Sequence, residues 1–60
     1  MTAEDWYRKG NAYRQQGNYA EAINCYAEAS RIDPDSPAAE AKKMLEEIIN
    51  FIFQELLLKD

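Results

Sequence analysis

Apolar and polar residues recur along this chain with the period of an α-helix, in three successive stretches. At 100° per residue, Trp6, Gly10 and Tyr13 fall on one side of the first stretch. The second stretch carries a wider apolar arc, made up of Tyr19, Ala22, Ile23, Cys25, Tyr26, Ala29 and Ile32. The third stretch becomes more apolar toward its end. This pattern predicts an all-α chain with three helices, at about residues 3–16, 19–32 and 37–59.

Capping residues support the first two of these helices. Thr2 followed by Asp5 predicts a capping box at a helix start, in which the Thr2 hydroxyl accepts a backbone N–H and the Asp5 carboxylate lies at the positive end of the helix. Gly17 predicts the end of the first helix, because glycine adopts the left-handed conformation that commonly follows a last turn. Asn18 followed by Glu21 predicts a similar box at the start of the second helix.

Two prolines separate the second helix from the third. Pro34 predicts a stop near Ile32, since it biases the preceding residue away from helical geometry and has no N–H to donate. Ser36 is the expected cap of the third helix, with Pro37 at the first helical position. No helix-breaking residue follows before Lys59, so the third helix is expected to be the longest.

The first two helices are expected to pack closely. We expect Gly10 to face the small residues Ala22 and Ala29, so that the two backbones approach each other. The aromatic rings expected to fill the space around this crossing are Trp6, Tyr13 and Tyr26. The alternative, an aromatic cage for a cation, is less favoured because packing already explains the spacing.

The residues from Ala3 to Ser36 resemble one tetratricopeptide repeat. The members of the pattern are Trp6, Gly10, Tyr13, Ala22, Tyr26, Ala29 and Pro34. Lys9 departs from it, since the family usually has leucine there; a lysine stem can cover the apolar surface. The resemblance implies a repeat unit over residues 3–36, a long capping helix over residues 37–60, and a scaffold for contact with other proteins.

The resemblance also implies a place for a peptide. In this family the first helix of each repeat lines a groove that holds an extended peptide. The residues that would line it here are Tyr7, Asn11, Arg14 and Gln15. Asn11 matches one position of a clasp that some members close on a C-terminal carboxylate, although one repeat cannot complete that clasp. An extended peptide or a neighbouring repeat is therefore the alternative partner, as in a receptor fragment of a longer array.

The third helix is more apolar than a capping helix requires. Its large apolar residues span roughly 240° of the helix surface, against the stripe of about 100° or more that a surface helix needs; they are Met44, Leu45, Ile48, Ile49, Phe51, Ile52, Phe53, Leu56 and Leu57. We expect five residues to dock the helix on both earlier helices, namely Ala38, Ala41, Leu45, Ile48 and Ile52. About two turns should extend beyond them.

This surplus predicts self-association, which would complete the fold as a homodimer or a higher homo-oligomer. Burying a large apolar side chain is worth about 1.5–3 kcal/mol, and a whole domain is stable by only about 5–15 kcal/mol. The expected contact residues are Ile49, Phe51, Phe53, Leu56 and Leu57. A two-fold pairing of third helices is the simplest closed arrangement. Exchange of the helix between chains, or cover by a neighbouring repeat of a longer protein, are the alternatives.

Charge and composition exclude several other functions. Seven Lys and Arg against eleven Asp and Glu give a net charge of −4, which argues against nucleic acid or an anionic membrane as partner. The apolar run 48–58 is too short to span a bilayer. The N-terminus lacks the basic and apolar regions of a signal peptide, so a cytoplasmic setting is expected.

Catalytic chemistry is not expected. The chain has no His to activate a nucleophile and only two Gly, too few for a glycine-rich phosphate loop. Cys25 is the only cysteine, so it cannot form a disulfide within the chain, and its place on the apolar arc predicts a small core residue. We therefore expect no enzyme, no cofactor and no metal site.

Overall fold

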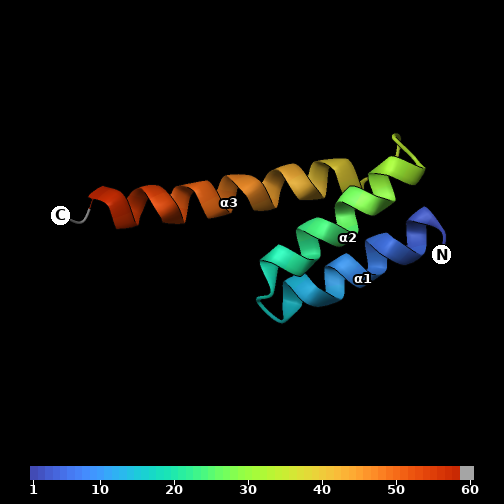
Figure 1. Ribbon diagram of the computed structural model, residues 1–60, viewed down its shortest axis with the longest axis horizontal. Coiled ribbons are helices and arrows are strands. Elements are labelled where there is room, and N and C mark those ends of the chain that lie inside the picture. The colour runs from blue at the N-terminus through green and yellow to red at the C-terminus, as the bar shows by residue number, and fades with distance from the viewer. Residues whose placement is uncertain (59–60) are drawn as a thin grey trace.

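The computed structural model describes residues 1–58, which form three helices. They are α1 (Ala3–Gln15), α2 (Tyr19–Ile32) and α3 (Ala38–Leu58). Figure 1 shows α1 and α2 as an antiparallel hairpin, with α3 crossing α2 and running on far beyond it. The all-α prediction is confirmed. The first helix ends one residue earlier than predicted, and Lys59, the predicted last residue of the third helix, lies outside the described residues.

The caps of α1 and α2 follow the sequence signals. The Asp5 N–H donates to Thr2 Oγ1 and the Thr2 N–H donates to Asp5 Oδ2, both at 3.1 Å, so the capping box is confirmed. Hydrogen bonding to Thr2 lowers the pKa of the Asp5 carboxyl, and the bond from the Thr2 backbone N–H has the largest effect. Gly17 has a φ of 80°, as predicted. Asn18 Oδ1 accepts from the Glu21 N–H, which confirms its capping role. Within residues 1–58 the Glu21 side chain accepts no bond from the Asn18 N–H, so the prediction of a complete second box was wrong.

The turn between α2 and α3 is held by its own side chains. Asp33 is extended, with φ −137° and ψ 99°, as expected of a residue before proline. Its Oδ1 accepts from the Asp35 N–H at 3.0 Å. Ser36 Oγ accepts from the Ala38 N–H at 3.1 Å, which confirms its capping role. The helix begins at Ala38 rather than at the predicted Pro37, because the first carbonyl to accept an N–H bond from the residue four positions on is that of Pro37.

Tyr26 lies fully buried at the centre of a small core. The buried cluster consists of Ala22, Tyr26, Ala29, Ala38 and Leu45. A Cβ atom added at Gly10 would lie 2.6 Å from Tyr26 Cε1 and 2.7 Å from Tyr26 Cδ1. The Tyr26 ring, expected to lie around the crossing of α1 and α2, therefore occupies the space left by the missing side chain of Gly10. Ile32, expected on the buried arc, is 44% exposed at the end of α2.

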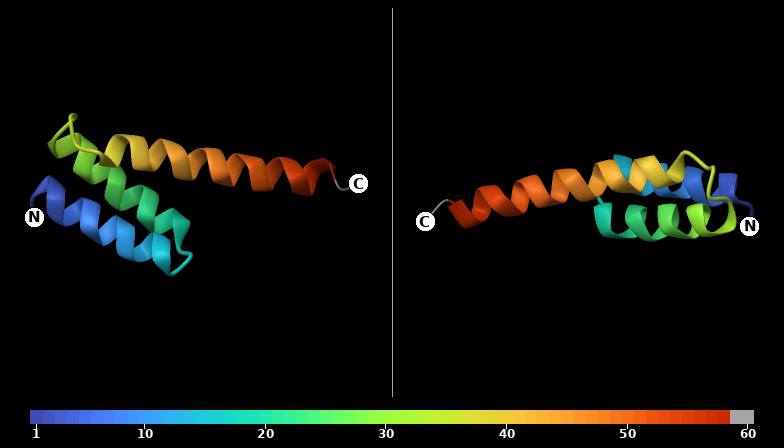
Figure 2. Two further views of the ribbon diagram at one scale, coloured as in Figure 1. Left: turned by 180° about the vertical axis from the view of Figure 1, so that it is seen from behind. Right: turned by 90° about the horizontal axis from the view of Figure 1, so that it is seen from above.

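Only the first third of α3 is docked. It packs mainly on α2, through Ala38 and Leu45 with Ala41 beside them, rather than equally on both earlier helices. The expected docking of Ile48 and Ile52 was wrong, because these side chains are 44% and 48% exposed. As Figure 2 shows, α3 crosses α2 at an angle and diverges from it, which shortens the contact. The part beyond Leu45 is about 20 Å long, more than the two turns expected.

The close contact at Gly10 predicts the effect of a substitution. Gly10→Ala should lower the free energy of unfolding by about 1–3 kcal/mol, because the new methyl group overlaps the Tyr26 ring. Helix propensity alone gives the opposite sign, since alanine is favoured over glycine by about 1 kcal/mol. Urea unfolding followed by circular dichroism measures the change. Ala12→Gly, at an exposed position of α1, is the control for propensity; a Gly10→Ala variant more stable than the parent would contradict the packing.

Candidate functional site

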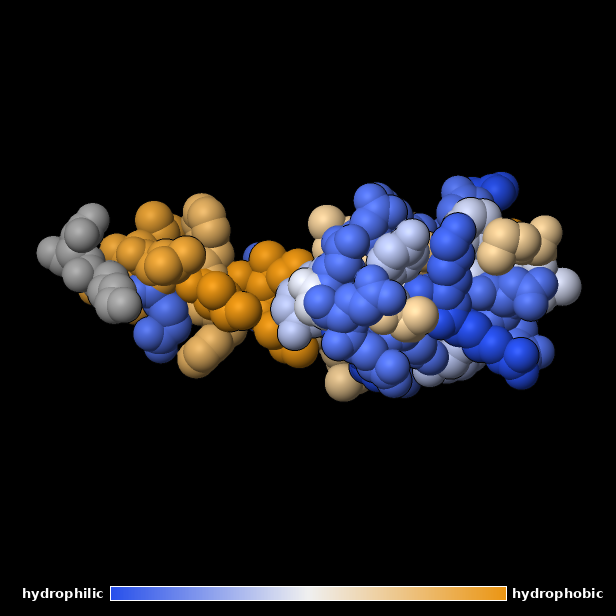
Figure 3. Space-filling view, turned by 90° about the horizontal axis from the view of Figure 1, so that it is seen from below, coloured by the Kyte–Doolittle hydropathy of each residue, from blue (hydrophilic) through white to orange (hydrophobic). Residues whose placement is uncertain are grey.

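The distal part of α3, residues 46–58, forms an exposed apolar surface that we call the overhang. Every residue in it is exposed. Figure 3 shows the apolar side chains of this part of the molecule standing clear of a largely polar body. Of the eleven large hydrophobic residues that are exposed in residues 1–58, nine belong to α3: Met44, Ile48, Ile49, Phe51, Ile52, Phe53, Leu56, Leu57 and Leu58. The other two are Met1 and Ile32, so exposed apolar surface is concentrated on one helix.

These side chains form two strips along α3. The first strip is Ile49, Ile52, Phe53 and Leu56, which line a surface hollow of about 170 Å³. The second strip is Met44, Ile48 and Phe51, which line another hollow together with Glu47. In the first strip, Ile52 follows Leu45 by seven residues, so it lies on the side of α3 that docks on α2. The first strip therefore continues the face of α3 that docks on α2, beyond the last residue that α2 covers.

The predicted self-association residues divide between these surfaces. Ile49, Phe53 and Leu56 lie in the first strip, and Phe51 lies in the second. Leu57 is 65% exposed and falls, by helical angle, on a third side. Ile52 was not predicted as a surface residue, because its side chain was expected to dock on the earlier helices of the same chain. The apolar spacing of Ile52 was visible in the sequence, but the angle at which α3 diverges from α2 (Figure 2) was not.

The polar residues of the overhang are all acids or amides. Glu46, Glu47 and Glu55 carry charge, with no Lys or Arg in residues 46–58. Glu46 is paired across one turn with Lys42, at 3.5 Å between Oε1 and Nζ. This ion pair is partly exposed, so it contributes little to stability. Any partner of the overhang therefore meets apolar side chains bordered by negative charge.

Half of the predicted peptide groove is engaged in holding Tyr26. The ring of Tyr7 packs against the ring of Tyr26, with centroids 5.7 Å apart and planes at 41°. Asn11 Oδ1 accepts a hydrogen bond from the Tyr26 hydroxyl, which is otherwise enclosed. Burial also raises the pKa of this phenol. Arg14 and Gln15, in contrast, are exposed at the end of α1.

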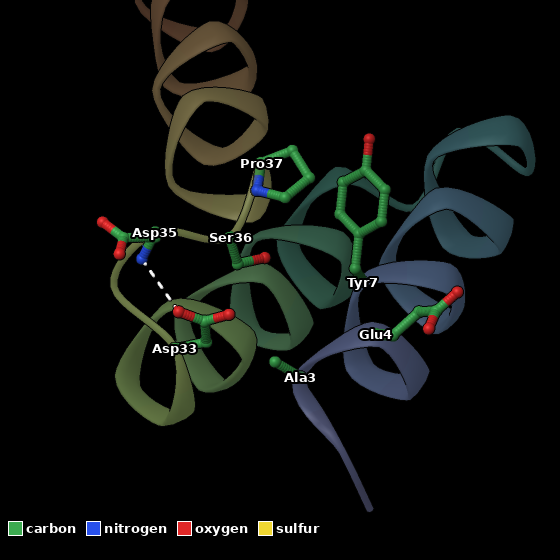
Figure 4. Close-up of a pocket in the computed structure, with 7 residues that line it drawn as sticks. All are labelled: Ala3, Glu4, Tyr7, Asp33, Asp35, Ser36 and Pro37. Carbon is green, nitrogen blue, oxygen red and sulfur yellow. Dashed lines mark hydrogen bonds between the residues drawn. The ribbon is translucent and has the colours of Figure 1, made fainter.

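A hollow of about 340 Å³ lies where α1 meets the turn between α2 and α3. Its lining residues are Ala3, Glu4, Tyr7, Asp33, Asp35, Ser36 and Pro37. Figure 4 shows Tyr7 on α1 beside Pro37, with Asp33 and Asp35 on the facing turn. In the sequence, the turn is recognisable only as a helix boundary, so this hollow was not predicted. It extends the predicted groove from Tyr7 toward an acidic end.

Two other residues singled out in the sequence have packing roles. Lys9 places its Nζ 5.2 Å from the centre of the Trp6 ring, so it covers apolar surface while its charge stays near water. Cys25 is buried, as predicted for a core residue. Desolvation raises the pKa of its thiol, which disfavours the reactive thiolate. Within residues 1–58, no His, Cys, Asp or Glu side chains are grouped to hold a metal.

A helix-turn-helix unit followed by a further helix is the arrangement of one helical repeat with a capping helix. The family model for the tetratricopeptide repeat matches residues 3–36, and the chain belongs to this family. No curated protein and no solved structure matches it. The family is in general a scaffold for protein–protein interaction rather than a family of enzymes. In residues 1–58, no helix has both the length and the apolarity needed to cross a membrane.

Proposed function

We propose that this protein is a protein-interaction module that associates with copies of itself through α3. Residues 3–36 act as the repeat unit, and residues 37–60 act as the association helix. One observation carries the proposal: the first strip is between 36% and 63% exposed at every position, on the side of α3 that packs on α2 nearer its start. We place the module in the cytoplasm, where the single Cys25 stays reduced.

The energetic argument is that a small fold gains much from covering this surface. A chain of about 60 residues buries only about 60% of its unfolded surface and is marginally stable. Each first-strip side chain is about half exposed, so covering it contributes roughly 1 kcal/mol. Four such side chains on each of two chains represent a sizeable fraction of a domain's stability of about 5–15 kcal/mol.

The distribution of apolar surface identifies the matching surface on a second copy. The outside of the α1–α2 hairpin exposes only Met1 and Ile32 among large hydrophobic residues of the described chain. An apolar contact between identical chains therefore covers the most exposed apolar surface when it brings α3 against α3. Exchange of α3 between hairpins is an alternative form of self-association, in which α3 of one chain docks on α2 of the other. Cover by a neighbouring repeat of a longer protein is the alternative, and it predicts a monomer for the sixty residues alone.

A charge placed in the first strip should separate the chains. Phe53→Glu should lower the association constant at least about tenfold, since burying an unpaired carboxylate costs more than about 1.4 kcal/mol. Multi-angle light scattering at micromolar concentration gives the mass. Gln54→Glu is the matched control, because it adds the same charge one residue further, on the polar side of α3.

The parent and the control should both exceed the 6.9 kDa mass of one chain, while Phe53→Glu approaches it. Circular dichroism checks that the hairpin of Phe53→Glu remains folded. A parent chain that is monomeric under these conditions contradicts self-association and favours cover by another repeat.

A second function, peptide binding along α1, is favoured by the hollow beside Tyr7. The predicted groove residues run from this hollow to the exposed Arg14, which forms no ion pair with the rest of residues 1–58. An extended peptide would place its C-terminal carboxylate at Arg14 and its basic end near Asp33 and Asp35. Because Asn11 is already bonded to Tyr26, Arg14 is the main polar contact proposed.

Removing this guanidinium should weaken binding of a peptide that has a free C-terminal carboxylate and basic residues toward its other end. Arg14→Ala should raise the Kd about tenfold, because a hydrogen bond to a charged group contributes about 1.5–3 kcal/mol. Lys9→Ala removes the same charge from the opposite side of α1 and should leave the Kd nearly unchanged. Isothermal titration calorimetry measures both. Equal affinities for Arg14→Ala and the parent would rule out this groove.

A further inference from the structure

The first strip has the same spacing in both directions along the chain. From Ile49, the steps to Ile52, Phe53 and Leu56 are three, one and three residues, and they are three, one and three again from Leu56 backwards. Resting on the proposed self-association, we infer that two copies pair antiparallel through this strip. The two-fold axis passes between Ile52 and Phe53. Ile49 then lies against Leu56 of the second copy, and the Ile52 and Phe53 side chains of both chains surround the axis.

The hairpin blocks the parallel alternative. Packed helices lie about 8–10 Å apart. On the side of α3 that carries the first strip, α2 already occupies that position over Ala38 and Leu45. A parallel second copy in register would bring its own residues 38–45 into the same space. Two first strips can therefore pair in parallel only if α3 separates from α2.

In the antiparallel pair, neither α3 occupies the space of the other chain's hairpin. With the axis between Ile52 and Phe53, Leu58 of the second copy lies opposite Glu47. This position is two residues beyond Leu45, the last buried residue of α3. The described overlap, residues 47–58, is about 18 Å of helix. Each hairpin then sits just past the end of the other chain's described helix, without competing for the docking face.

Charge also favours the antiparallel pair. In a parallel pair, Glu46, Glu47 and Glu55 would each lie at the same level along the helix axis as the identical acid of the second copy, and the overhang has no Lys or Arg to offset them. In the antiparallel pair, Glu55 lies opposite Asn50 of the second copy. The two Glu47 side chains are separated by roughly 16 Å along the helices, which exceeds the Debye length of about 8 Å at physiological salt.

Disulfide formation between single cysteines tests this arrangement. Two variants, Ile49→Cys and Leu56→Cys, are each made in a Cys25→Ala background. Both substitutions lie beyond the buried core, so the hairpin should fold, as circular dichroism can check. The variants are oxidised separately, and also after unfolding and refolding as an equal mixture. Non-reducing electrophoresis measures the linked dimer. A disulfide requires Cα atoms within about 7 Å.

The antiparallel pair predicts a linked dimer in the mixture and almost none in either variant alone. In that pair, identical positions 49 lie roughly 10 Å apart along the helices. Linkage of Ile49→Cys with itself would show a parallel pair and overturn the inference. Absence of linkage in the mixture, while the parent still associates, would also overturn it and leave self-association intact. A monomeric parent would instead remove the proposed function itself.

Discussion

The fold depends on the contact between the backbone at Gly10 and the ring of Tyr26. Because position 10 has no side chain, the Tyr26 ring lies in close contact with α1 at this position, and the two helices of the hairpin can pack closely there. Tyr7 and Asn11 then hold the ring by packing and by a hydrogen bond to its hydroxyl. The same ring belongs to the core on which α3 docks. One glycine therefore determines the geometry of α1, α2 and the start of α3.

The small size of this core explains the exposed surface. The side chains around Tyr26 are mostly alanines, and the cluster reaches only as far as Leu45 on α3. The helix continues to Leu58 with its docking face uncovered. A tetratricopeptide repeat stacked on others would have neighbours on such a face, whereas this single unit has none within residues 1–58. The proposed pairing lets each α3 serve as the neighbour of the other.

Local signals in the sequence predicted the helices well, and non-local packing less well. Thr2, Gly17 and Ser36 act within a few residues of themselves, so their roles follow from sequence. The crossing of α3 over α2 depends on the shapes of many side chains together, and periodicity does not fix it. For that reason the exposure of Ile48 and Ile52 was missed. The surplus of apolar residues on α3 was visible from composition, but its division into two strips was not.

Hydrogen exchange along the overhang tests the central claim most directly. A helix of about 13 residues without tertiary support is marginal in water, so an uncovered overhang should open and exchange its backbone amides quickly. If α3 pairs with α3, amide exchange at residues 49–56 should slow as protein concentration rises, while exchange in the α1–α2 hairpin changes much less. Rapid exchange at residues 49–56 at every concentration would contradict the account.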